Sequence, residues 1–162
     1  MDVAVIGDTH IPSRAHAIPA PFRERIEAAD HVIHTGDFDA EGTLADIRAM
    51  ASRLTAVAGN VDRRMGLPDV ATVELGDVTF VVTHGAGSHR GYERRVANIV
   101  REEAGPNAVG VAGHTHEVLD TVHDGVRLLN PGSATGAPSA DRATMLTLGV
   151  RDGELDVTVH EA

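Results

Sequence analysis

Residues 1–10 read MDVAVIGDTH, a short apolar run followed at once by polar side chains. Residues 3–6 of this run are rich in valine, which predicts a buried strand. Gly7 ends the strand, and Asp8-Thr9-His10 follows it. An apolar run that stops at residues able to bind a ligand recurs along the chain, and this repetition decides the fold.

Nine further apolar runs also predict strands. They cover residues 31–34, 54–58, 70–75, 78–83, 108–112, 118–122, 126–129, 144–150 and 155–160. Helical spacing predicts helices at residues 21–29, 41–52 and 91–104. The first third therefore alternates strands with helices, which implies parallel strands. Later, Gly76-Asp77 and Asp124-Gly125 predict the turns of hairpins.

These elements predict an α/β (α+β) fold with a β core and helices outside it. A core of two sheets is favoured, although periodicity alone does not distinguish it from a single mixed sheet. The 162 residues contain no linker, repeat or low-complexity segment, so we expect a single domain over residues 1–162. Aromatic residues make up only 2%, so aliphatic side chains must fill the core.

The composition excludes several classes of protein. No stretch approaches the roughly 18–20 apolar residues of a membrane span, and the N-terminus does not resemble a signal peptide. We therefore expect a cytoplasmic protein without membrane contacts. There is no cysteine, which excludes disulfides and thiolate metal sites.

The chain carries a net charge of −10, and all 14 basic residues are arginine. An acidic surface repels the phosphate backbone, so a nucleic-acid partner is not expected. The acidity has two interpretations: ordinary solubility, or adaptation to the high-salt cytoplasm of a halophilic host.

Five predicted strands end at residues that commonly bind metals. These residues are Asp8, His10, Asp37, Asn60, His84, His114 and His116. Ligands of α/β folds bind at the carboxyl ends of strands, where loops from different strands converge. Each short motif taken alone is commonly just a turn or a helix cap, but the series of them at strand ends indicates one shared site.

The residue types point to metal chemistry. Carboxylate, amide and imidazole groups suit Mn, Fe, Zn, Ni or Co. Seven candidates exceed the needs of one tetrahedral site but suit two metals that share a carboxylate. The pairs Asp8/His10 and His114/His116 have i, i+2 spacing, so in extended backbone both members point to one side.

The order of these motifs resembles the calcineurin-like metallophosphoesterase family over most of the chain. The matching motifs are Gly7-Asp8-Thr9-His10, Gly36-Asp37, Gly59-Asn60-Val61-Asp62, Thr83-His84-Gly85, Gly113-His114-Thr115-His116 and Asn130-Pro131-Gly132-Ser133. In its short length the chain resembles the members of a small bacterial and archaeal branch of the family. This branch includes phosphodiesterases and is related to the retromer scaffold subunit. The resemblance implies a four-layer αββα sandwich with metals at one edge.

The resemblance also implies a role for each ligand. Asp8, His10 and His116 would hold one divalent ion, while Asn60, His84 and His114 would hold a second. Asp37 would bridge the two ions, and Asp37, Asn60 and His84 would be directly involved in catalysis. The implied function is a phosphodiesterase that activates a bridging water, with manganese favoured and a small phosphate ester as substrate.

Two positions depart from the family pattern. Many members have histidine after the asparagine as a proton donor, and this chain has Val61; small-branch members commonly lack this histidine too. His34, His89 or water could replace it. Related chains often have histidine at the position of Ala86. These departures keep open a scaffold or binding module without catalysis, and a sensor that binds a nucleotide without cleaving it.

Several other polar residues near these motifs have open roles. Arg63 and Arg64 are candidates for binding substrate phosphate, or form a solvated charge pair. Asp62 is interpreted as a supporting or turn residue, and Ser133 and Asn130 as supports of the site. The sequence leaves homo-oligomer formation open.

Overall fold

The computed structural model describes residues 1–162 and contains ten strands and three helices. The first sheet has the order β10-β9-β1-β2-β3 and the second the order β4-β5-β6-β8-β7. The strands of the first sheet are β1 (Asp2–Ile6), β2 (His31–His34), β3 (Leu54–Ala56), β9 (Thr144–Arg151) and β10 (Glu154–Glu161). Those of the second are β4 (Val70–Leu75), β5 (Val78–Thr83), β6 (Val109–Val111), β7 (Val118–His123) and β8 (Val126–Pro131).

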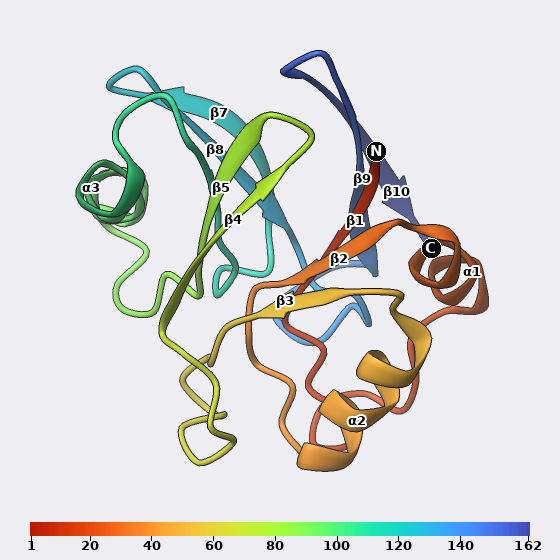
Figure 1. Cartoon of the computed structure of the whole chain (residues 1–162). Coiled ribbons are helices and arrows are strands. Elements are labelled where there is room, and N and C mark those ends of the chain that lie inside the picture. The colour runs from red at the N-terminus through yellow and green to blue at the C-terminus, as the bar shows by residue number, and fades with distance from the viewer.

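The helices lie on the outer faces of the two sheets, so the molecule has four layers (Figure 1). Helices α1 (Ala20–Ala28) and α2 (Glu41–Met50) pack on the first sheet, and α3 (Tyr92–Ala104) packs on the second. This αββα sandwich confirms the expected fold and decides for two sheets rather than one. All ten predicted strands and three predicted helices are present, with ends that differ by at most two residues. None of the helices is long and apolar enough to span a membrane.

Alternation along the strands builds three apolar layers. In β1, Val3 and Val5 face the space between the sheets, whereas Ala4 and Ile6 face α1 and α2. In β5, Phe80 and Val82 lie between the sheets, and Val81 points toward α3. Successive side chains of a strand point to opposite faces, so a continuous apolar run is expected where both faces are covered.

The strands that precede the predicted ligands run parallel to their neighbours. The first sheet pairs β1 with β2 and β2 with β3 in parallel, and the second pairs β5 with β6 in parallel. The carboxyl ends of each parallel group therefore share one edge of their sheet. The packing of the two sheets brings these edges together.

Candidate metal centre

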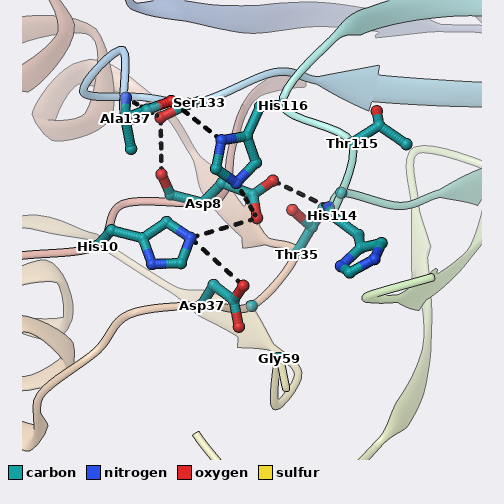
Figure 2. A network of polar contacts seen from close by, with 12 residues as sticks. Asp8, His10, Thr35, Asp37, Gly59, His114, Thr115, His116, Ser133 and Ala137 are labelled. Atoms are coloured by element: carbon teal, nitrogen blue, oxygen red, sulfur yellow. Dashed lines mark hydrogen bonds and ion pairs between the residues drawn. The ribbon is translucent and has the colours of Figure 1, made fainter. Parts of the chain in front are cut away.

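All seven predicted ligands lie together where these parallel strands end. Asp8 and His10 follow β1, Asp37 follows β2, and Asn60 follows β3. His84 follows β5, and His114 and His116 follow β6. Figure 2 shows the Asp8, His10, Asp37, His114 and His116 side chains converging on one centre. The structure therefore combines ligands from both sheets into a single cluster.

Two carboxylates lie at the middle of the cluster. Asp37 Oδ2 is 3.3 Å from His10 Nε2 and 3.2 Å from His84 Nε2. Asp8 Oδ1 is 3.4 Å from His116 Nε2, 3.9 Å from His10 Nε2 and 4.0 Å from His84 Nε2. Asp37 thus lies between one histidine of each expected metal set, as a bridging ligand would.

Two groups of three have ligand atoms within 4.8 Å of one another: Asp8, His10 and His116, and Asp8, Asp37 and His84. The first group is the set that the family resemblance implied for one ion. The second group shares Asp8 with the first, so both carboxylates, and not Asp37 alone, reach toward both halves of the cluster.

Hydrogen bonds to backbone carbonyls fix which nitrogen of each imidazole is free. The carbonyl oxygens of Thr35, Ala137 and Gly87 can only accept, so the ring nitrogens facing them must carry the protons. His84 Nδ1 therefore donates to Thr35 O at 2.7 Å, and His116 Nδ1 donates to Ala137 O at 3.0 Å. By the same reasoning, His114 Nε2 donates to Gly87 O at 2.9 Å.

The opposite nitrogens of these neutral rings carry lone pairs that face other acceptors. His84 Nε2 is 2.9 Å from Asn60 Oδ1 and 3.3 Å from His114 Nδ1. Asp8 Oδ1 and both nitrogens of His10 are buried without any hydrogen-bond partner. Buried polar groups normally have partners, so this convergence of lone pairs calls for a cation. The residues present therefore fit the divalent metals that their chemistry predicts.

Electrostatics within the cluster also favour positive charge. Burial alone would raise the pKa of the Asp37 carboxyl, but its contacts with His10 and His84 hold that pKa well below its usual range. Burial would lower the pKa of His84, yet Asp37 and Asp8 raise it overall. The pKa of His116 is raised in the same way by Asp8, against the effect of burial. A group that attracts a proton in this way also attracts a metal ion.

The loops that carry the ligands have unusual backbone conformations. Asp8, His10, Asp37, His114 and His116 all have positive φ angles, between 46° and 76°. Non-glycine residues seldom adopt this region, and strained conformations cluster at functional sites. Gly36 has φ of 99°, and a Cβ there would lie 2.6 Å from the Gly59 nitrogen. The close approach of the two loops therefore requires glycine at this position.

Asp62 holds two of the ligand loops together. Its buried carboxylate accepts hydrogen bonds from the backbone N–H groups of Asp37, Phe38 and Asp39, at 2.6 to 3.1 Å, and from Gly59 at 2.9 Å. The first three amides belong to the loop after β2 and the last to the loop after β3. One side chain thus fixes the backbone around Asp37 relative to the start of the Asn60 loop.

Asn130 of β8 and Ser133, which follows β8, support the ligands, as expected. Ser133 Oγ donates to Asp8 O at 2.7 Å, and Asn130 Nδ2 donates to Gly113 O at 3.1 Å. The Tyr92 hydroxyl donates to the same Gly113 carbonyl at 2.7 Å. No sequence motif indicates Tyr92, because its role depends on α3 packing against the His114 loop.

The structure separates the two histidines considered as proton donors. His34 is fully buried, accepts from the Gly36 N–H through Nδ1 and so donates to Thr9 Oγ1 through Nε2 at 2.7 Å. Burial lowers its pKa to about 3. His34 is therefore a buried, hydrogen-bonded histidine that has no proton to offer a substrate at neutral pH. His89 is exposed, with its ring centroid 5.9 Å from that of His114.

The two arginines considered for phosphate binding, and one further aspartate, lie around the cluster. Arg63 and Arg64 are exposed on the loop after Asn60 and form no ion pair. Asp39, which the sequence analysis did not select, places Oδ1 3.5 Å from His10 Nδ1. The spacing of Asp39 from Asp37 repeats the i, i+2 pattern of the other pairs and could have indicated it.

Comparison with known proteins agrees with this geometry. Residues 1–153 match the calcineurin-like phosphoesterase superfamily domain. The chain therefore belongs to the calcineurin-like phosphoesterase family.

Within the family, the chain is similar to archaeal proteins. It is 31% identical over 153 residues to a probable metallophosphoesterase of Methanocaldococcus jannaschii, covering 94% of this chain and 77% of the relative. It is 29% identical over 161 residues to one of Methanothermobacter thermautotrophicus, covering 98% and 91%. The crystal structure of Vps29 from Entamoeba histolytica complexed with Zn²⁺ is also similar, with a TM-score of 0.73, 27% identity and 99% coverage of both chains.

Proposed function

We propose that this chain is a metal-dependent phosphoric ester hydrolase that acts on phosphodiesters. The observation that carries the proposal is the convergence of imidazole lone pairs and an unpartnered carboxylate oxygen at the junction of the two sheets. Membership of a phosphoesterase family supports the same chemistry.

Two divalent ions would occupy the centre in this proposal. Asp8, His10 and His116 would hold one ion, Asn60, His84 and His114 the other, and Asp37 would bridge them. When bound, such ions acidify a water and neutralise charge on the phosphate oxygens. Manganese is our first choice, and nickel, iron, cobalt and zinc also suit these ligands. A similar structure, Vps29 of Entamoeba histolytica, was determined in complex with Zn²⁺, which supports the binding of a divalent ion by this fold.

The residues of the chain would orient the reactants. Carbonyl hydrogen bonds hold the His84 and His116 rings, so their free nitrogens keep a fixed direction. Arg63 and Arg64, being exposed and free of ion pairs, would bind the phosphate oxygens. The oxygen of a water forms a bond to phosphorus while the bond to the leaving oxygen breaks. Val61 has no proton to give, so the leaving oxygen would take its proton from water.

The test is hydrolysis of bis-p-nitrophenyl phosphate by purified protein loaded with Mn²⁺, with the metal content measured by mass spectrometry. We expect turnover, two metals per chain, and a loss of about 100-fold or more in kcat/KM in His84→Ala. His31→Gln is the matched control, because His31 begins β2 at the end opposite Asp37. Protein that binds Mn, Ni, Co or Fe but turns over no ester would refute the proposal.

The same measurements test a second candidate function, an interaction module with a bound metal. The Val61 side chain, next to Asn60, is 43% exposed, and Ala86, two residues after His84, is also exposed. Small apolar groups beside the centre favour contact with another protein over proton transfer. This function predicts metal binding without turnover and a stable complex in pull-down experiments.

A further inference from the structure

A cleft of about 380 Å³ lies beside the candidate metal centre. We call it the α3–β7 cleft, and its main side chains are His89, Tyr92, Arg94, Glu117, Val118 and Leu119. The first three come from the start of α3 and the segment before it, and the others from β7 and the residue before it. Small-molecule sites typically have volumes of roughly 300–1,000 Å³, so the cleft has room for a group of the size of a sugar.

The cleft adjoins the metal centre through the His114–His116 loop. Thr115, between these two candidate ligands, lines the cleft, and Figure 2 shows its side chain pointing away from His10 and Asp37. His89 also lines the cleft, and its ring meets the His114 ring edge-on at 5.9 Å between centroids. A diester whose phosphorus lies at the centre could therefore extend one ester group past His114 into the cleft.

The charges of the cleft favour an uncharged, hydroxyl-bearing group. Arg94 and Glu117 form no ion pair and no side-chain hydrogen bond to another side chain, whereas Glu93 is in contact with His123 at 3.6 Å. The cleft thus offers an unpaired donor and an unpaired acceptor, which together match a hydroxyl group. Two carboxylates against one guanidinium disfavour a second phosphate.

Apolar side chains complete the cleft. Val118 is 38% exposed, and Tyr92 and Leu119 join it in the lining. Most of the other lining residues are polar, so the cleft is more polar than a typical small-molecule site. The combination suits a ring with an apolar face and hydroxyls at its edge.

We infer that the α3–β7 cleft binds the sugar of a small phosphodiester, with the ester phosphate at the metal centre. This inference rests on the proposed function and names its substrate class. The net charge of −10 disfavours a long polyanion, so the substrate is a small sugar ester rather than a nucleic acid.

The kinetic test compares two diesters with the same leaving group, p-nitrophenyl thymidine 5′-phosphate and methyl p-nitrophenyl phosphate. We expect the Mn-loaded protein to prefer the thymidine ester, and Val118→Trp to reduce the ratio of the two kcat/KM values at least 10-fold. Glu117→Gln should raise KM for the thymidine ester several-fold with little change in kcat. The matched control is Val122→Trp, because Val122 is 64% exposed on the same strand but lies outside the cleft.

A binding test separates this inference from the proposed function. Saturation-transfer NMR of thymidine with chelator-treated protein needs no metal and no turnover. We expect transfer to thymidine in the wild type and Val122→Trp, and its loss in Val118→Trp. Absence of transfer in the wild type, or equal effects of Val118→Trp on both diesters, would overturn the inference. Thymidine binding without hydrolysis of either diester would instead support the cleft and refute the proposed function.

Discussion

At the residue scale, the proposed function makes Val61 the residue that decides how the leaving group can depart. Its backbone N–H donates to Asp37 Oδ1 at 3.2 Å, so the residue lies directly beside the candidate centre. Its exposed isopropyl group cannot transfer a proton. Esters of acidic alcohols need no proton donor, whereas alkyl esters do.

We therefore expect Val61→His to gain activity on alkyl diesters. A positioned general acid contributes roughly 10²–10⁴-fold, so an increase of about 10-fold or more in kcat/KM for an alkyl leaving group is expected. The rate with p-nitrophenyl leaving groups should change little. Val61→Gln serves as the control, because it has similar length without an acid. Equal gains for both leaving groups would contradict the proton-donor explanation.

His34 makes the folded state sensitive to acid. An unfolded histidine titrates near ~6.5, whereas the buried His34 has a pKa of about 3. Between these values the unfolded chain binds a proton that the folded chain excludes. The contribution of neutral His34 to stability is therefore complete above ~6.5 and is lost as the pH falls toward 3.

Urea unfolding at pH 7.5 and pH 5.0, in chelator, tests this expectation. The wild type should lose more unfolding free energy between these pH values than His34→Gln does. His16→Gln is the control, because the His16 side chain is exposed. An identical pH dependence in wild type and His34→Gln would show that His34 is not responsible.

Residue types and order were enough to predict the seven candidates, because each follows an apolar strand. The sequence did not predict which ring nitrogen of each histidine faces the candidate metal centre. This depends on the carbonyls of Thr35, Ala137 and Gly87, and each of these lies more than 20 residues from the histidine it holds. The role of Tyr92 was not predictable for the same reason, since it depends on a contact between α3 and the His114 loop, which are distant in sequence.

At the element scale, the loops after β2 and β3 act as one unit because Asp62 bonds to both. Replacing one carboxylate oxygen by an amide nitrogen in Asp62→Asn removes an acceptor from backbone amides that have no other partner. A buried N–H without an acceptor destabilises by about 1–3 kcal/mol. The displaced loop should also hold Asp37 and Asn60 less accurately.

We expect Asp62→Asn to lower the unfolding free energy by about 1–3 kcal/mol and to weaken Mn²⁺ binding by roughly 10–100-fold. Calorimetric titration of apo protein with Mn²⁺, alongside urea unfolding, measures both. Asp77→Asn is a suitable control, because Asp77 lies in the β4–β5 turn with φ of 67°, which asparagine tolerates. Unchanged metal affinity in a destabilised Asp62→Asn would show that Asp62 supports the fold alone.

The elements themselves were predictable from periodicity, since the strands are covered on one or both faces by apolar layers. The residues at which the elements end were less predictable. Residues 57 and 58 continue the apolar pattern of β3, but the strand ends at Ala56, where the chain turns toward Asn60. The order of strands within a sheet depends on contacts distant in sequence, such as β9 beside β1, and periodicity does not record such contacts.

At the scale of the whole molecule, the acidic surface opposes the compact state. The chain carries a net charge of −10 on 162 residues and has no lysine. Folding brings these like charges closer together, so their mutual repulsion is stronger in the folded state than in the unfolded chain. Salt screens exposed charges, with a Debye length of about 10 Å at 0.1 M and about 3 Å at 1 M. If the acidity reflects a high-salt cytoplasm, the melting temperature should rise steadily as KCl increases from 0 to 2 M in the presence of chelator.

A charge-reduced variant tests whether repulsion is the cause of this salt dependence. Glu102 and Glu103 are exposed near the C-terminal end of α3, where the helix dipole disfavours negative charge. The double variant Glu102→Gln/Glu103→Gln should melt higher than the wild type at low salt and gain less from KCl, so that the two curves converge near 2 M. Parallel curves would mean that KCl acts by other routes than screening. A wild-type melting temperature that is highest near zero salt would rule out the halophilic interpretation and leave the acidity as a matter of solubility.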